Sequence, residues 1–144
     1  MRGPTSILVL LLCLCLGGSC AAPRVHVPAG DPSLPFSDAV DTGGTLYVAG
    51  HLGLDPRTGR PPEEPAAEAR LLLDAFESTL ARAGMTMDDL VMVQVHCVNP
   101  ALYDTFNAVY RERFDGPFPA RAFLGSAELL RGCRFEMLGI AVRR

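Results

Sequence analysis

The chain has 144 residues, with 13 basic against 16 acidic side chains and a formal net charge of −3 at pH 7. This balance argues against a surface that binds nucleic acid, because such surfaces are strongly basic. All 13 basic residues are arginines, so no lysine is present for Schiff-base chemistry with a substrate or with pyridoxal phosphate.

An apolar run over residues 7–16, with Arg2 before it and small residues after it, is typical of a secretory signal peptide. The run is too short to cross a bilayer as a permanent helix. We expect residues 1–21 to be removed on export and residues 22–144 to form one domain.

Two cleavage patterns overlap at the end of this segment. Small residues at Ser19 and Ala21 suit ordinary signal peptidase. Cys20, in contrast, stands where a lipoprotein carries the cysteine that receives a lipid. Both patterns predict a periplasmic or cell-envelope protein, which contacts a membrane only if Cys20 carries a lipid.

Turn and cap residues divide the remaining chain into short elements. Gly43 and Gly44 suit the tip of a two-residue hairpin, Gly84 ends a helix, and Asn99 with Pro100 starts another. The expected elements are an extended run at 25–27, strands at 37–41 and 45–49, a helix at 64–83, a strand at 90–98, a second helix with a stripe of Leu102, Phe106, Tyr110 and Phe114, and strands at 121–127 and 134–142.

The first helix is predicted from apolar residues at helical spacing, such as Leu72, Phe76 and Leu80. Its charged residues, including Glu68 and Glu77, take other faces. The element order is therefore β-β-β-α-β-α-β-β, which predicts an α+β fold with two helices on one face of a single mixed sheet. In so short a chain, we expect another subunit to cover the second face.

Two charged residues near the ends of apolar runs are the candidate site. Arg121 follows Pro117 and Pro119, which stiffen the backbone, and its planar guanidinium suits bidentate capture of a carboxylate. Glu136 is then a candidate base. The alternative is that Arg121 and Glu136 form a structural ion pair or are solvated charges at the ends of strands.

The strand pairing decides whether these two side chains meet. If the last two strands pair antiparallel about a turn near residues 130–131, Arg121 and Glu136 lie roughly 13 Å apart along the pair. That distance is too long for one compact site, so we expect a second subunit to complete the cleft.

Other reactive residues predict no additional site. The spacing of His51 with Asp55, and of His96 with Cys97, does not build a closed set of metal ligands, so no metal is expected. Cys97 lies in an apolar strand and is predicted to be a core residue. Three serines lack a G-x-S-x-G setting or a nearby histidine and predict no nucleophile: Ser37, Ser78 and Ser126.

Five segments in order, spanning residues 24–144, resemble the reactive intermediate/imine deaminase family (RidA; YjgF/YER057c/UK114). They are residues 35–40 (PFSDAV), 46–55 (LYVAGHLGLD), 106–110 (FNAVY), 118–121 (FPAR) and 135–142 (FEMLGIAV). The resemblance implies a homotrimer of chorismate-mutase-like subunits with clefts between neighbouring chains. It also implies hydrolysis of 2-imino or 2-enamino acids to 2-keto acids and ammonium, without a cofactor.

The resemblance assigns roles to particular residues. Arg121 binds the substrate carboxylate and Glu136 orients or activates water. The substrate-binding residues are Phe36, Gly50, Asn107, Arg121 and Phe123.

Three positions depart from the family pattern. Phe36 stands where tyrosine is frequent and Ala49 where serine is frequent, so two hydroxyl groups are lost. Phe123 stands where cysteine is frequent, and its side chain, which is larger than that of cysteine, reshapes the cleft. The alternative function is therefore a non-catalytic trimeric binder of small carboxylates. Ribonuclease or translation-inhibitor activity, reported for relatives, fits poorly with the net charge of −4 left after Arg2 is removed.

Overall fold

A computed structural model describes residues 23–144 of the chain. Its strands and long helices are β1 (Val25–Pro28), β2 (Ser37–Asp41), β3 (Thr45–Leu52), α1 (Pro65–Arg82), β4 (Leu90–Cys97), α2 (Tyr103–Arg111), β5 (Ala120–Gly125) and β6 (Phe135–Val142). Short 3₁₀ helices lie between them at η1 (Met87–Asp89), η2 (Pro100–Leu102) and η3 (Leu130–Gly132). This order confirms the predicted β-β-β-α-β-α-β-β arrangement; the predicted signal segment lies outside the described residues.

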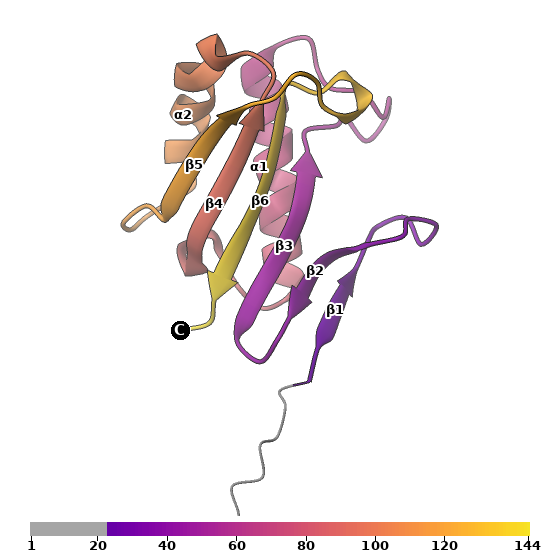
Figure 1. Ribbon diagram of the computed structural model, residues 1–144, viewed down its shortest axis with the longest axis vertical. Helices are drawn as coiled ribbons and strands as arrows, with labels where there is room; N and C mark the ends of the chain where they lie inside the picture. Colours follow the sequence, from indigo (N-terminus) through magenta and orange to yellow (C-terminus); the bar gives the residue numbers. More distant parts are fainter. Residues whose placement is uncertain (1–22) are drawn as a thin grey trace, which may run out of the picture.

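The strands form one six-stranded mixed sheet in the order β1-β2-β3-β6-β4-β5 (Figure 1). β4 and β5 run parallel, and all other neighbours run antiparallel. At the tip of the β2–β3 hairpin, Gly43 and Gly44 have φ angles of 88° and 116°. Glycine reaches this region without the steric cost that other residues meet, so the predicted turn is confirmed.

The predicted pairing of the last two strands is wrong. β5 lies at the sheet edge beside β4 and runs parallel to it, with Arg121 opposite Val93. The reason is α2, because a crossover through a helix brings the next strand back in the same direction. β6 then enters between β3 and β4, antiparallel to both.

Helix α1 begins and ends where its sequence supplies caps. The carboxylate of Glu64 accepts hydrogen bonds from two backbone N–H groups of the first turn, and Pro65 occupies the first helical position. Gly84, with φ of 69°, follows the last turn. The predicted helix at 64–83 is therefore confirmed.

Helix α2 is shorter than its predicted apolar stripe. Leu102 lies in η2, capped by the side chain of Asn99, and Phe114 follows the end of α2. Phe106 and Tyr110 are buried on α2 itself, and Phe114 still packs against the core. The Gly-Pro pair after Phe114 does not continue a helix, so the chain turns here towards β5.

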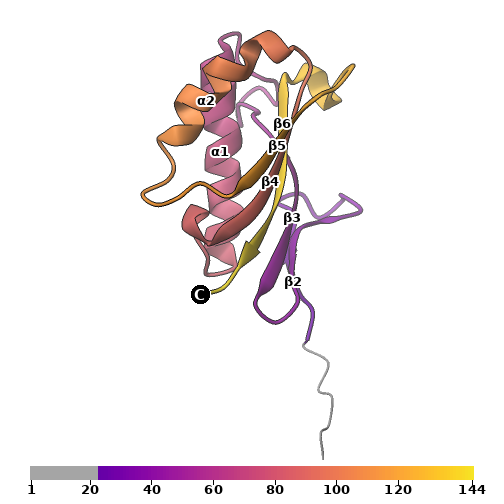
Figure 2. The same cartoon turned by 60° about the vertical axis from the view of Figure 1, so that its left-hand side comes forward.

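Both helices cover the same face of the sheet (Figure 2). Strand residues that face them are buried, such as Val93 and Met137, whereas their neighbours Gln94 and Leu138 point to the other face and are half-buried. Within residues 23–144 no helix covers that other face, where Tyr47 is 52% exposed. No helix in this part of the chain is long and apolar enough to cross a membrane.

A buried carboxylate joins α1 to the start of β6. Glu68, predicted only to lie away from the apolar stripe, is fully buried. It accepts hydrogen bonds from the backbone N–H groups of Arg134 and Phe135 at 2.6 and 3.0 Å, and from Arg134 Nε at 2.7 Å. The charge is thus compensated inside the protein, as a buried carboxylate requires.

His51 in β3 is a structural histidine. Its Nδ1 donates to the carbonyl of Ala49, so Nε2 accepts from the hydroxyl of Thr79, both at 2.8 Å. Its ring also meets the edge of Phe76, with centroids 5.2 Å apart. Burial lowers the pKa of His51 from its ordinary value of 6.5.

This lowered pKa predicts a loss of stability in mild acid. As pH falls below 6.5, the unfolded chain takes up a proton at His51 before the folded chain does, so the free energy of unfolding decreases. Urea unfolding of the wild type and His51→Gln at pH 7.5 and pH 5.5 measures the effect. We expect a smaller decrease in the variant, and equal decreases would contradict the prediction.

Candidate functional site

Arg121 lies on the edge strand β5, and its side chain points to the face that the helices cover. The guanidinium carbon is 4.5 Å from the ring centroid of Tyr110, and Nη2 donates to Asn107 Oδ1 at 2.5 Å. Asn107 is itself buried on α2, so its amide is a fixed acceptor. Arg121 and Asn107, both predicted to bind substrate, are therefore in contact in the structure.

Aromatic rings surround the same guanidinium. The centroids of Tyr103, Phe106 and Phe123 lie 5.8, 6.0 and 6.0 Å from the guanidinium carbon. Contact with ring faces stabilises a cation while leaving its N–H groups directed elsewhere. Phe123, a predicted binding residue, thus lies beside Arg121.

The charge of Arg121 has no partner of opposite sign within residues 23–144, where it forms no ion pair. The alternative of a structural ion pair with Glu136 is therefore wrong within one chain. A cavity of about 210 Å³ opens at this guanidinium. Its lining residues are Tyr103, Asn107, Tyr110, Arg111, Phe118, Pro119 and Arg121. A positive group in such a cavity is suited to a small anion.

Tyr110 contributes its ring rather than its hydroxyl. Its side chain is 3% exposed, and the hydroxyl has no hydrogen-bond partner among the described residues. Burial raises the pKa of Tyr110 to about 12, so the phenol stays neutral beside Arg121. The stacked ring therefore supports the guanidinium without neutralising it.

Glu136 and Gly50 form a second group on the opposite, uncovered face of the sheet. Glu136 lies on β6 opposite His96 of β4, and both residues alternate with neighbours that face the helices. Gly50 on β3 lies so close to the Glu136 side chain that a Cβ built at position 50 would be 2.1 Å from Glu136 Oε1. Glycine at position 50 therefore gives the carboxylate its space.

One chain does not bring the two groups together. Arg121 pairs with Val93, which pairs with Gly139, and Glu136 lies three positions before Gly139 on β6. Strand spacing and rise place the Cα atoms of Arg121 and Glu136 about 14 Å apart. Their side chains also point to opposite faces, so the predicted separation holds although the predicted strand pairing was wrong.

Phe36 lies apart from Arg121. It precedes β2, which is four places from β5 in the sheet, and its ring is 52% exposed. The structure therefore does not bring Phe36 to the Arg121 cavity within one chain.

The contact between Gly50 and the Glu136 carboxylate provides a test of the role of Glu136. We expect Gly50→Ala to displace the carboxylate while the fold remains intact, because the clash is with the far end of a flexible side chain. If Glu136 positions water, turnover of an imino acid falls by about tenfold or more. Gly30→Ala is the matched control, since a Cβ there meets nothing within 4 Å. Equal turnover of the two variants would rule out a role for this carboxylate position.

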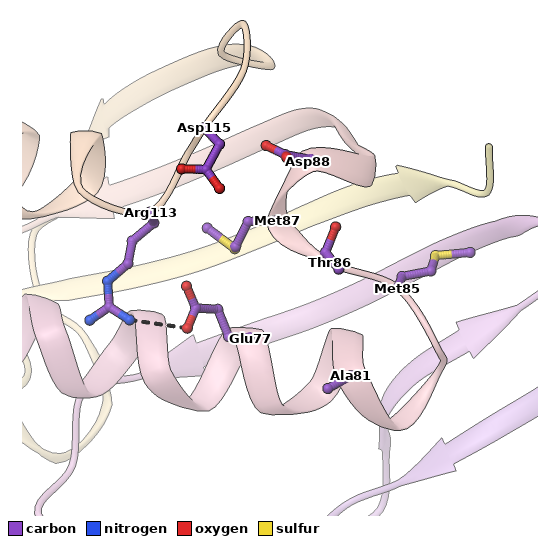
Figure 3. Close-up of a pocket in the computed structure, with 8 residues that line it drawn as sticks. All are labelled: Glu77, Ala81, Met85, Thr86, Met87, Asp88, Arg113 and Asp115. Carbon is purple, nitrogen blue, oxygen red and sulfur yellow. Dashed lines mark hydrogen bonds and ion pairs between the residues drawn. The ribbon is translucent and has the colours of Figure 1, made fainter.

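A second cavity, of about 370 Å³, lies between α1, η1 and the segment after α2 (Figure 3). Its arginine, Arg113, is already paired with Asp74 at 2.8 Å and with Glu77 at 3.0 Å. Asp88 and Asp115 add negative charge to the lining. This cavity is therefore unsuited to an anion, and the Arg121 cavity is the candidate site.

The expectation that the serines have no nearby histidine is wrong for two of them. Ser126 Oγ lies 3.3 Å from His96 Nδ1, and Ser37 Oγ lies 3.0 Å from His26 Nδ1. No local pattern in the sequence indicated these contacts, because the pairing of β1 with β2 and of β4 with β5 creates them. No carboxylate of residues 23–144 is hydrogen-bonded to either histidine, so the orienting third group of a nucleophilic triad is missing from this part of the chain.

Cys97 and Cys133 are buried free thiols, which confirms the core position predicted for Cys97. Burial raises the pKa of Cys97, and raises that of Cys133 to about 11, so both resist ionisation. Among the described residues, no three side chains of histidine, cysteine, aspartate or glutamate are grouped to hold a metal ion.

The structure is thus a small α+β domain with a cavity at Arg121 whose charge suits a small anion. The profile of the family described as Endoribonuclease L-PSP matches residues 28–143. The chain therefore belongs to this family, the YjgF/RidA group that the sequence predicts.

Known relatives and solved structures agree with this membership. The 2-iminobutanoate/2-iminopropanoate deaminase of Dermatophagoides farinae is 34% identical over 115 residues, which are 79% of this chain and 90% of that protein. The crystal structure of the Escherichia coli YjgF gene product is 32% identical, with a TM-score of 0.73 over 83% of this chain and 94% of its own. E. coli TdcF with bound serine is 27% identical, with a TM-score of 0.74 and coverage of 83% and 94%.

Proposed function

We propose that the protein hydrolyses 2-imino or 2-enamino acids to 2-keto acids and ammonium. Water adds to the carbon of the C=N bond, the C–N bond then breaks, and nitrogen leaves as ammonia that takes up a proton. The imine carbon is already electrophilic, so the protein needs mainly to hold the substrate and place a water molecule. The name of the Dermatophagoides relative supports this reaction class.

The observation that carries the proposal is the uncompensated guanidinium of Arg121. Asn107 and Tyr110 hold it in a cavity, and no carboxylate of residues 23–144 neutralises it. The substrate carboxylate supplies the missing charge. The serine bound to TdcF also carries a carboxylate, which fits this chemistry.

We assign Glu136 the role of positioning the attacking water, from a second copy of the chain. Within one chain it lies on the other face of the sheet from Arg121, so a site that uses both needs a neighbour. The uncovered face carries exposed Tyr47 and half-buried Leu138 and Ile140, which supports burial against another subunit. We propose a homotrimer with a cleft at each subunit contact, and light scattering after size-exclusion chromatography measures the mass.

The reaction is tested directly with an amino-acid oxidase. The oxidase generates a 2-imino acid from its amino acid, and the rate of 2-keto acid formation is followed with and without the protein. We expect the protein to raise that rate in proportion to its concentration. An unchanged rate at all concentrations would refute the hydrolase function.

The second candidate is a non-catalytic trimeric binder of small carboxylates. The hydroxyl groups lost at Phe36 and Ala49 favour it, because they leave fewer donors for the reacting atoms. Saturable binding of pyruvate at Arg121 without any acceleration in the oxidase assay is the result that this candidate predicts.

We also propose that the protein is exported to the periplasm or cell envelope with residues 1–21 as its signal peptide. Residues 7–16 form its apolar part. Mass spectrometry of the mature protein tests the two cleavage patterns. A lipid-modified Cys20 at the N-terminus supports the anchor, whereas an unmodified N-terminus at residue 22 refutes it.

A further inference from the structure

Tyr103 lines the Arg121 cavity, and the family resemblance assigns it no role. It is the first residue of α2, and Asn107 lies one helical turn later on the same face. Its ring is 45% exposed and lines the cavity with Arg121. The Tyr103 side chain is therefore accessible to a ligand that binds at Arg121.

The Tyr103 ring is held in place by Phe123. The two rings meet edge to face, with centroids 5.0 Å apart and an interplanar angle of 88°. Phe123 in turn packs against buried Phe106, with centroids 5.8 Å apart. The large residue at position 123 therefore serves as the support that fixes Tyr103 over the cavity.

Tyr103 lines the same cavity as Asn107 and Arg121, and the guanidinium carbon of Arg121 lies 5.8 Å from the centroid of its ring. Asn107 and Arg121 lie close enough to the hydroxyl to lower the pKa of Tyr103. Arginine has only donors, so towards Arg121 the hydroxyl acts as an acceptor. Asn107 Oδ1 already accepts from Arg121 Nη2. This amide oxygen has a second lone pair, but an ionised carboxylate held at the guanidinium is the stronger acceptor for the hydroxyl hydrogen of Tyr103.

We propose that Tyr103 is a substrate-binding residue whose hydroxyl donates a hydrogen bond to the carboxylate held by Arg121. It restores, from α2, a phenolic donor of the kind that the chain lacks at Phe36. This inference rests on the proposed function, because it assumes that Arg121 binds a carboxylate.

The test is a binding cycle with pyruvate as the probe, measured by calorimetry on the purified protein. We expect Tyr103→Phe, which keeps the ring and its contact with Phe123, to weaken binding about tenfold. In an Arg121→Ala background the same change is expected to alter the remaining affinity less than about twofold, because the carboxylate is no longer held there. Arg57→Ala, at an arginine that is 87% exposed in a loop and paired with Asp55, is the control and is expected to bind like the wild type.

The outcomes separate the two proposals. If the wild type binds pyruvate, Arg121→Ala loses binding and Tyr103→Phe binds as tightly as the wild type, only the role of Tyr103 is overturned. The same holds if Tyr103→Phe costs as much without Arg121 as with it. If the wild type shows no saturable binding of pyruvate, both the carboxylate site and the role of Tyr103 are overturned.

Discussion

Arg121→Ala is expected to lower kcat/KM for a 2-imino acid by about 100-fold or more. A charge-assisted pair with a carboxylate contributes about 3 kcal/mol when it is partly removed from water, and each 1.4 kcal/mol is a factor of ten. Arg121 has no ion pair within residues 23–144 to lose, so its removal affects the ligand more than the fold. The oxidase-coupled assay measures the change.

Two variants make this result specific. Arg121→Lys keeps the charge but lacks the planar fork, so we expect it to recover only part of the activity. Arg57→Ala removes an equally charged arginine that is 87% exposed in a loop and paired with Asp55, and we expect wild-type activity. If Arg121→Ala retains wild-type kcat/KM, Arg121 does not bind the substrate.

Glu68→Ala is expected to lower the free energy of unfolding by about 3–5 kcal/mol. The substitution leaves the buried N–H groups of Arg134 and Phe135 without their acceptor and the Arg134 side chain without its ion pair. It also opens space between α1 and the start of β6. Urea unfolding monitored by circular dichroism measures the loss.

The control for Glu68 is another glutamate of the same helix. Glu77 pairs with Arg113 near the surface, its side chain is 38% exposed, and Arg113 keeps Asp74 when Glu77 is removed. Glu77→Ala is therefore expected to cost less than about 1 kcal/mol. If the two variants lose similar free energies of unfolding, the buried hydrogen bonds of Glu68 stabilise the fold no more than the surface pair of Glu77 does.

Local signals were sufficient for the elements of the fold. The glycine pair at positions 43 and 44, the glycine at position 84 and the cap at Asn99 each act on neighbouring residues of the chain, so the sequence alone predicts their effects. Glu68 was not recognised as buried, because its partner Arg134 lies far along the chain. A charged residue in a helix gives no local sign that a distant arginine will compensate it.

The candidate site was predictable in part. Arg121, Asn107 and Phe123 were expected at one site and do lie together. Tyr103 was missed, although its spacing of four from Asn107 on a predicted helix was a usable signal. Glu136 with Gly50 was expected as well, but its position relative to Arg121 depended on a strand order that was wrong.

By itself, the sequence determined the class of fold, the order of strands and helices, and the residues that bear charge at the site. These follow from periodicity, caps and turns, which act over a few residues. Only the tertiary structure decided that β6 enters between β3 and β4, and that Arg121 and Glu136 point to opposite faces of the sheet. The reason is that strand pairing and the side chain's face are set by long-range packing of α2 and β5 on β4, for which a short stretch of sequence carries no signal.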